Sequence, residues 1–171
     1  MRMIRIITAS ATLLALSITA CSSGDLAAPE DARRQRGAAS AGVERPWKAD
    51  CTVDARFTSG STLTIEGTCQ MAHLGRTTVV AYQTVSAVPG GFAYTNTATY
   101  TAANGDELRT TAVGMATITS TGLSLAGIET AVGGTGRFMH ASGTGTQEGA
   151  VRFVSPSTTT GNYSTLGRLT Y

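Results

Sequence analysis

The sequence has few charged and few aromatic residues, which make up 14% and 6% of its 171 positions. Globular chains usually carry about 25% charged residues, so this composition argues against a coiled coil, an acidic disordered protein or a polybasic nucleic-acid binder. Arg2 and Arg5 lie in a segment that we expect to be removed, and the remaining 11 basic residues balance the 11 acidic ones. A neutral chain exerts no long-range field on polyanions, so we expect no nucleic-acid partner.

Residues that carry common catalytic or metal chemistry are also scarce. The two histidines, His73 and His140, are far apart, and no Asp or Glu recurs at ligand spacing around either of them, so we expect no metal site. The sequence has no G-x-S-x-G nucleophile motif and no helical periodicity longer than two turns. These absences predict no metal site, and they favour a protein that is not an enzyme.

Residues 1–20 are typical of an export signal. Arg2 and Arg5 precede an apolar stretch over residues 6–18, which is too short to span a bilayer because that takes about 20 residues. The junction Ile18-Thr19-Ala20-Cys21 resembles the lipobox of bacterial lipoproteins. There the cysteine is linked to diacylglycerol and then acylated, with palmitate as the expected chain. An uncleaved anchor helix with a chance cysteine is the alternative.

The segment from Cys21 to Pro46 is predicted to be an acylated cysteine followed by a flexible tether. It is rich in Gly, Ala and Ser, has a mixed-charge run over residues 30–36, and shows no apolar periodicity. Several acyl chains give stable membrane anchoring, so we expect an exported protein held at the cell envelope. Ser22 rather than Asp follows the cysteine, which resembles outer-membrane sorting if the cell is Gram-negative.

From Cys51 onward, apolar and polar residues alternate with a period of two, which is typical of half-buried strands. Residues 51–57 and 63–69 are separated by Ser59-Gly60-Ser61, and this spacing predicts a hairpin with Phe57 opposite Leu63. The same register places Cys51 opposite Cys69. Directly opposed Cβ atoms are close enough to bridge with a small adjustment, and export favours disulfides. Two separately buried thiols remain the alternative.

Six further strands are predicted, over residues 76–87, 94–102, 108–119, 123–132, 144–154 and 162–171. Asn104-Gly105 lies between two of them and predicts a type I′ turn, in which both central residues have positive φ. About eight strands in the domain 47–171 indicate an all-β fold. An antiparallel barrel, whose closure removes exposed edges, and a two-sheet sandwich both fit the pattern.

Residues 133–143, GGTGRFMHASG, decide in favour of the barrel. They resemble the GGTG-x-F-x-x-A-x-G stretch of plant dirigent proteins, of the related allene oxide cyclases and of exported bacterial proteins that share it. The matching positions are Gly133, Gly134, Thr135, Gly136, Phe138, Ala141 and Gly143. The resemblance implies an eight-stranded, calycin-like antiparallel barrel with a ligand cavity and no cofactor. Because plant members are often trimeric, it also raises a homotrimer as an assembly to test.

The family's activities are expectations of a different kind. Dirigent proteins orient phenoxy radicals during coupling, and the cyclases fold an unstable epoxide into a cyclopentenone. No set of inward polar residues transfers position by position from either family, and a fold does not fix a function. For the motif itself we expect a structural role, in which its glycines allow close packing between two strands and Phe138 plugs the barrel end.

Glu129 is the one weak catalytic candidate. It shares a strand face with Leu123, Leu125, Gly127 and Ala131, whereas Ile128 and Val132 lie on the other face. An inward Glu129 would line the cavity as a buried acid, but an outward Glu129 paired with an arginine is the interpretation we favour. Arg76, Arg109 and Arg137 fit either binding of an acidic ligand or plain surface charge.

Three functional hypotheses follow from these observations. The first is a lipid-anchored module that binds a small apolar or amphipathic molecule inside the barrel without catalysis. The second is a cofactor-free isomerase or coupling guide that uses Glu129. The third is a structural envelope protein with a solidly packed barrel. Small residues at Ala112, Gly114, Ala116 and Gly127 are consistent with internal room, but they would also ease tight barrel curvature.

Overall fold

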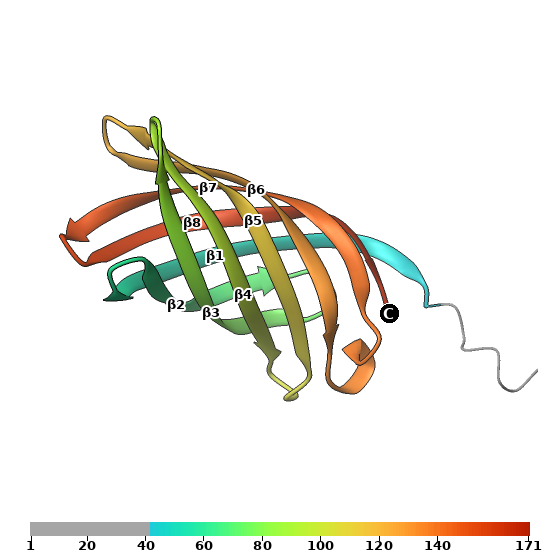
Figure 1. The fold of residues 1–171 in the computed structure, drawn as a ribbon. Helices are drawn as coiled ribbons and strands as arrows, with labels where there is room; N and C mark the ends of the chain where they lie inside the picture. The colour runs from blue at the N-terminus through green and yellow to red at the C-terminus, as the bar shows by residue number, and fades with distance from the viewer. Residues whose placement is uncertain (1–41) are drawn as a thin grey trace, which may run out of the picture. The chain divides into compact units, whose positions relative to one another are not determined.

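The computed structural model describes residues 42–171, which form a closed antiparallel barrel of eight strands (Figure 1). Each strand pairs with the next along the chain, and β8 closes the barrel against β1. The strands are β1 (Glu44–Ser59), β2 (Thr62–Met71), β3 (Gly75–Val88), β4 (Gly91–Ala102), β5 (Glu107–Thr119), β6 (Gly122–Gly134), β7 (Ser142–Ser155) and β8 (Thr158–Thr170). The expected all-β, eight-stranded antiparallel barrel is therefore confirmed over the two-sheet sandwich.

The barrel begins slightly earlier than the sequence indicates. Strand β1 starts at Glu44, so residues 44–46 of the expected tether belong to the barrel. The predicted signal peptide and the predicted lipid-attachment site, Cys21, lie outside the described residues. Within residues 42–171 there is no helix of the length and apolarity needed to cross a membrane.

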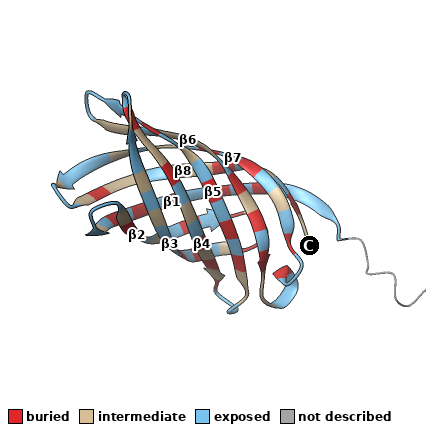
Figure 2. Ribbon diagram, in the orientation of Figure 1, coloured by how far each residue is buried: buried red, intermediate tan, exposed pale blue. Residues whose placement is uncertain are grey.

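The register of the first hairpin matches the one read from the alternation. Phe57 pairs with Leu63 and Cys51 pairs with Cys69, and the two cysteines form a disulfide. Along the strands, buried and exposed residues alternate, as the bands in Figure 2 show. This alternation places one side of each strand in the barrel interior and the other in solvent.

The turn at Asn104-Gly105 differs from the predicted type I′ turn. Gly105 has a positive φ of 86°, whereas Asn104 does not. The Gly105 amide donates to the carbonyl oxygen of Ala102, and Ala102 and Asp106 pair across the turn. This is a three-residue loop with glycine at the left-handed position, and the third loop residue removes the need for a positive φ at Asn104.

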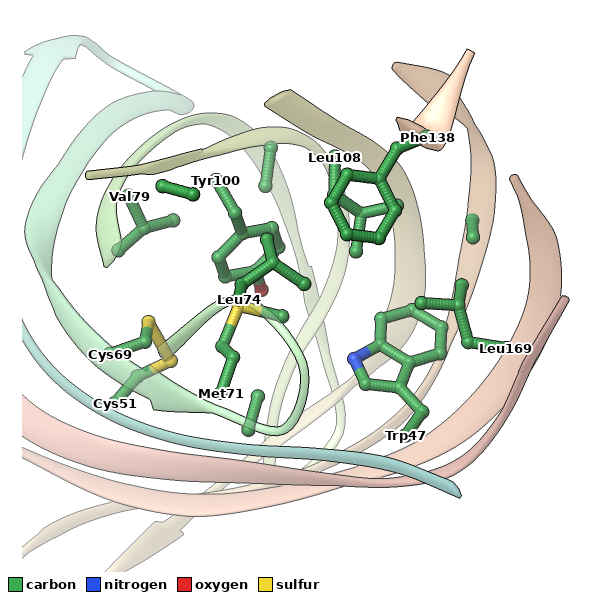
Figure 3. Close-up of a cluster of buried hydrophobic side chains, with 14 of the residues drawn as sticks. Trp47, Cys51, Cys69, Met71, Leu74, Val79, Tyr100, Leu108, Phe138 and Leu169 are labelled. Atoms are coloured by element: carbon green, nitrogen blue, oxygen red, sulfur yellow. A yellow bond between two sulfur atoms is a disulfide. The ribbon is translucent and has the colours of Figure 1, made fainter. Parts of the chain in front are cut away.

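One half of the barrel interior is packed with apolar side chains (Figure 3). Trp47, Leu108, Phe138 and Leu169 are each at most 2% exposed and meet at the end where β6 connects to β7. Phe138 comes from η2 (Gly136–Phe138), a 3₁₀ turn in that connection. The connection thus closes this end of the barrel with an aromatic ring.

Residues of the GGTG segment and the 3₁₀ turn after it form hydrogen bonds and an ion pair with two neighbouring turns. Gly133, with φ of 115°, follows an extra residue in β6 at a bulge against β5. The Thr135 hydroxyl accepts a hydrogen bond from the Glu107 amide at 2.9 Å. Arg137 pairs with Asp106 at 3.5 Å and donates to the backbone carbonyl of His73. Three turns are therefore held together around the Phe138 ring.

Candidate functional site

The other half of the barrel contains a cavity of about 230 Å³. It lies toward the end formed by four two-residue turns, and Pro156 of the β7–β8 turn is part of its lining. Most of the lining side chains are apolar, and Phe57, Leu63, Phe92, Leu125 and Phe153 are among them. The barrel thus has a packed half and a hollow half.

Glu129 lies inside the barrel and is 1% exposed, so the outward position that the sequence favoured is wrong. Its strand partners, Ala112 on β5 and Gly145 on β7, are small and leave room for a long side chain. Ile128 and Val132 are instead 48% and 58% exposed on the outer face. The alternation correctly assigns the residues of β6 to two faces, but the face that carries Glu129 points into the barrel.

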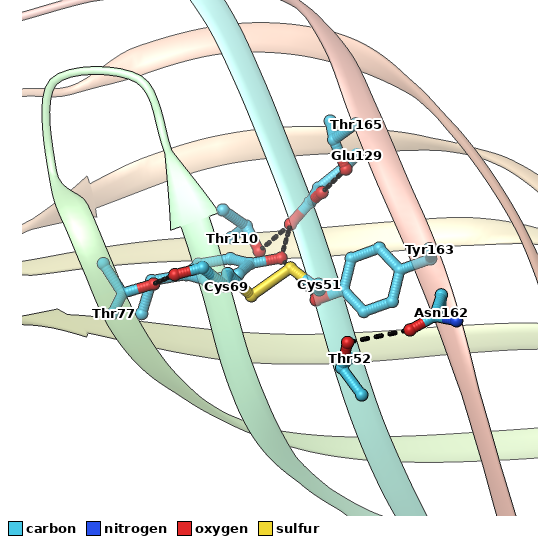
Figure 4. The surroundings of a disulfide bond; sticks show 10 residues. Cys51, Thr52, Cys69, Thr77, Thr110, Glu129, Asn162, Tyr163 and Thr165 are labelled. Carbon is cyan, nitrogen blue, oxygen red and sulfur yellow. Dashed lines mark hydrogen bonds between the residues drawn. A yellow bond between two sulfur atoms is a disulfide. The ribbon is translucent and has the colours of Figure 1, made fainter.

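Hydroxyl groups from three strands surround the Glu129 carboxylate (Figure 4). Tyr100 on β4 and Thr110 on β5 each donate to Oε1 at 2.7 Å. Thr165 on β8 donates to Oε2 at 2.6 Å. Within residues 42–171 no ion pair involves this carboxylate. Charge-assisted hydrogen bonds to hydroxyls, rather than a cationic side chain, therefore stabilise the buried charge.

Gly145 makes the Thr165 contact feasible. A Cβ added to Gly145 would lie 2.7 Å from Cγ2 of Thr165, which is too close for two carbon atoms. A side chain here would push Thr165 away from the carboxylate.

A second tyrosine extends the polar chain into the cavity. The Tyr163 and Tyr100 hydroxyl oxygens are 2.9 Å apart. Because the single Tyr100 proton points at Glu129, Tyr163 must be the donor in this pair. The hydrogen bonds run from Tyr163 through Tyr100 to Glu129, and all three residues line the cavity.

The phenols along this wall are held in their neutral form. Burial, followed by the negative charge of Glu129, raises the pKa of Tyr94 to about 12. The same two causes raise the pKa of Tyr100 well above its ordinary value, and burial is again the main cause for Tyr163. All three side chains are therefore hydrogen-bond donors at physiological pH.

Two glycines form the surface on which the Tyr94 ring lies. Tyr94, Gly114, Gly127 and Gln147 occupy neighbouring positions on β4, β5, β6 and β7. A Cβ at either glycine would lie 2.5 Å from the Tyr94 hydroxyl, and this hydroxyl donates to Gln147 Oε1 at 2.8 Å. The space that the sequence suggested at Gly114 and Gly127 is thus filled by a tyrosine, whereas Ala116 does line the cavity.

The predicted arginine candidates all lie away from the cavity. Arg109 pairs with Glu107 at 2.9 Å on the outer face, Arg137 is part of the closed end, and Arg76 is exposed on β3. His73 and His140 are exposed as well. Residues 42–171 contain no cluster of three or more potential metal ligands drawn from His, Cys, Asp and Glu.

Sequence reasoning missed four polar residues of the cavity wall, Tyr94, Tyr100, Gln147 and Tyr163. It also missed Thr110 and Thr165, which donate to the Glu129 carboxylate. The signal that could have found them is the phase of each strand. Each of them shares the inward phase of its strand with other buried or half-buried residues, although the sequence distances between them are large.

In comparisons with known families and curated proteins, no family model and no curated sequence matches this chain. The barrel is consistent with a calycin-like fold, and the site has to be interpreted from its own residues.

Proposed function

We propose that this protein binds a small apolar or amphipathic molecule inside the barrel, without catalysis. The supporting observation is the 230 Å³ cavity, which has a largely apolar wall and a polar inner end at Glu129 and Tyr163. Ligand sites are commonly apolar pockets with a few placed polar groups. A cavity of this size does not favour the alternative of a barrel packed throughout with side chains.

Native mass spectrometry of the purified full chain tests this proposal. A ligand in the cavity adds mass that leaves on collisional activation, whereas covalently attached acyl chains stay on the protein. Ala116→Phe places a ring in the cavity and should abolish the added mass. Thr117→Phe, on the outer face of the same strand, is the matched control and should retain it. Added mass that survives Ala116→Phe would show binding elsewhere, and a clean mass together with no shift in melting temperature across a lipid and phenolic panel would refute the proposal.

The second candidate function is a cofactor-free isomerase or coupling guide, similar to allene oxide cyclases and dirigent proteins. The hydrogen-bond chain from Tyr163 through Tyr100 to Glu129 supports it, because such a chain can move a proton between a ligand and a buried carboxylate. Glu129→Gln would interrupt that transfer. Unchanged turnover of every substrate on which the native protein is active would remove this role.

The envelope location is part of the proposal and rests on the sequence. Cys21 would carry the lipid, with palmitate among its acyl chains, and would hold the barrel at a membrane. Growth with labelled palmitate should label the native protein but not the Cys21→Ser variant. The native mass spectrum also distinguishes a monomer from the proposed homotrimer.

A further inference from the structure

The charged groups around the cavity are of one sign. Its lining contains one carboxylate, Glu129, and among the described residues no lysine, arginine or histidine contributes to it. The tyrosines of the wall are neutral, because burial raises the pKa of each phenol. A ligand that enters this cavity therefore meets a single negative charge with no cationic counterpart.

Two side chains that line the cavity have hydrogen-bond acceptor positions without a donor. A carboxylate offers about four acceptor positions, and Glu129 receives three hydrogen bonds, of which only one reaches Oε2. Asn96 adds a second open acceptor. Its Oδ1 is buried, has no hydrogen-bond partner within residues 42–171, and belongs to a residue that lines the same cavity. Buried polar atoms are normally paired, so both observations point to a ligand that donates hydrogen bonds.

We infer that the barrel selects a small organic cation, a protonated amine with an apolar body, whose ammonium group lies against Glu129. The inference rests on the proposed binding function and deepens it by naming the ligand class. An ammonium brings the positive charge that the cavity lining lacks, together with several N–H donors for its unpaired acceptors. An anionic ligand such as a fatty acid would place a second negative charge beside the buried carboxylate, which is costly in a low-dielectric interior.

The walls suit the apolar body of such a ligand. Aromatic rings from Phe57, Phe92, Tyr94, Phe153 and Tyr163 line the cavity, and aromatic faces attract ammonium groups by cation–π interaction. A cavity of ~150 Å³ holds one benzene molecule. The cavity volume of about 230 Å³ is about one and a half times that volume, which corresponds to a single ring with a short aminoalkyl chain.

Three ligands of matched size test the inference: 2-phenylethylamine, 2-phenylethanol and phenylacetate. Their affinities for the full chain are measured by isothermal titration calorimetry at neutral pH. We expect the amine to bind about tenfold more tightly than the alcohol, as charge-assisted hydrogen bonds are roughly twice as strong as neutral ones, and phenylacetate to bind most weakly. Glu129→Gln should bring the amine and the alcohol to similar affinities. Glu148→Gln, a neutralisation on the outer face of β7, should preserve the preference.

The outcomes separate this inference from the proposal on which it rests. If the alcohol or phenylacetate binds as tightly as the amine, the cation preference is overturned while the binding function stands. If Glu148→Gln abolishes the preference as Glu129→Gln does, the effect is a long-range one and the assignment to the cavity is overturned. If none of the three ligands binds, the cation preference is overturned. The binding function fails with it only if the native mass is also clean and no member of the lipid and phenolic panel shifts the melting temperature. The three ligands compared on the unmodified chain already decide the preference if Glu129→Gln does not fold.

Discussion

Replacing Gly127 with alanine should displace the Tyr94 phenol from its hydrogen bond to Gln147. The new Cβ would lie 2.5 Å from the Tyr94 hydroxyl and 2.7 Å from the Val113 carbonyl oxygen. The φ of Gly127 is not in the positive region, so alanine meets no backbone strain there. The substitution therefore acts through steric contacts of the new Cβ with neighbouring atoms, and the loss of stability can be estimated from those contacts.

The cost has two parts. Extra volume in a packed interior destabilises by about 1–3 kcal/mol. Movement of the phenol also leaves Oε1 of the 5%-exposed Gln147 without its donor, which costs about 1–3 kcal/mol more. We expect Gly127→Ala to lower the free energy of unfolding by roughly 2–6 kcal/mol.

A double-mutant cycle with Tyr94→Phe isolates the contact. Phenylalanine lacks the hydroxyl that the new Cβ would strike, and Gln147 is already unpaired in that background. The backbone contacts with the Val113 carbonyl oxygen and with Gly114 Cα persist, and because they are present in both backgrounds they cancel in the cycle. Gly127→Ala should therefore be less costly by about 1–3 kcal/mol in the Tyr94→Phe protein, measured by urea unfolding. Additivity within about 0.5 kcal/mol would refute the placement of Tyr94 across Gly127.

Three further predictions concern stability. Replacing Cys51 and Cys69 with alanine should lower the free energy of unfolding by about 3 kcal/mol, and a reductant should then have no further effect on the urea midpoint. Phe138→Ala should cost about 3–5 kcal/mol, whereas Met139→Ala, at a position 60% exposed, should change the same midpoint little. The pKa of Tyr94 is raised from 10.0 to about 12 in the fold. The contribution of the neutral phenol to the free energy of unfolding is therefore complete below about pH 10 and is lost as the pH rises toward about 12. Unfolding measured at increasing pH should show this fall, and a fall of equal size in Tyr94→Phe would contradict it.

Local alternation was sufficient to predict which residues share a strand face, and it predicted the first hairpin. The runs 51–57 and 63–69 have the same phase, and the short loop between them fixes which residues face each other. Register follows from this combination because a slip of one residue would turn every apolar side chain outward. The disulfide was predictable for the same reason.

The direction of Glu129 was not predictable from β6 alone. Both faces of that strand carry apolar residues, and a charged side chain is usually exposed. The groups that stabilise it inside, Tyr100, Thr110 and Thr165, come from three other strands up to 36 residues away. Only the closed barrel brings these hydroxyls to one point, so a single-strand pattern contains no sign of them.

The position of the GGTG segment explains why its resemblance indicates a fold rather than a ligand. Its glycines, Thr135, Arg137 and Phe138 hold the closed end, where the turns are joined and the ring is buried. The cavity is built from the opposite halves of the strands and includes no residue of the segment. A barrel can therefore retain this closed end while the residues around Glu129 vary, because the segment and the cavity lining have no residue in common. The chemistry of the ligand is set by the side chains of the hollow half, and it is there that substitutions should alter binding without weakening the fold's closure.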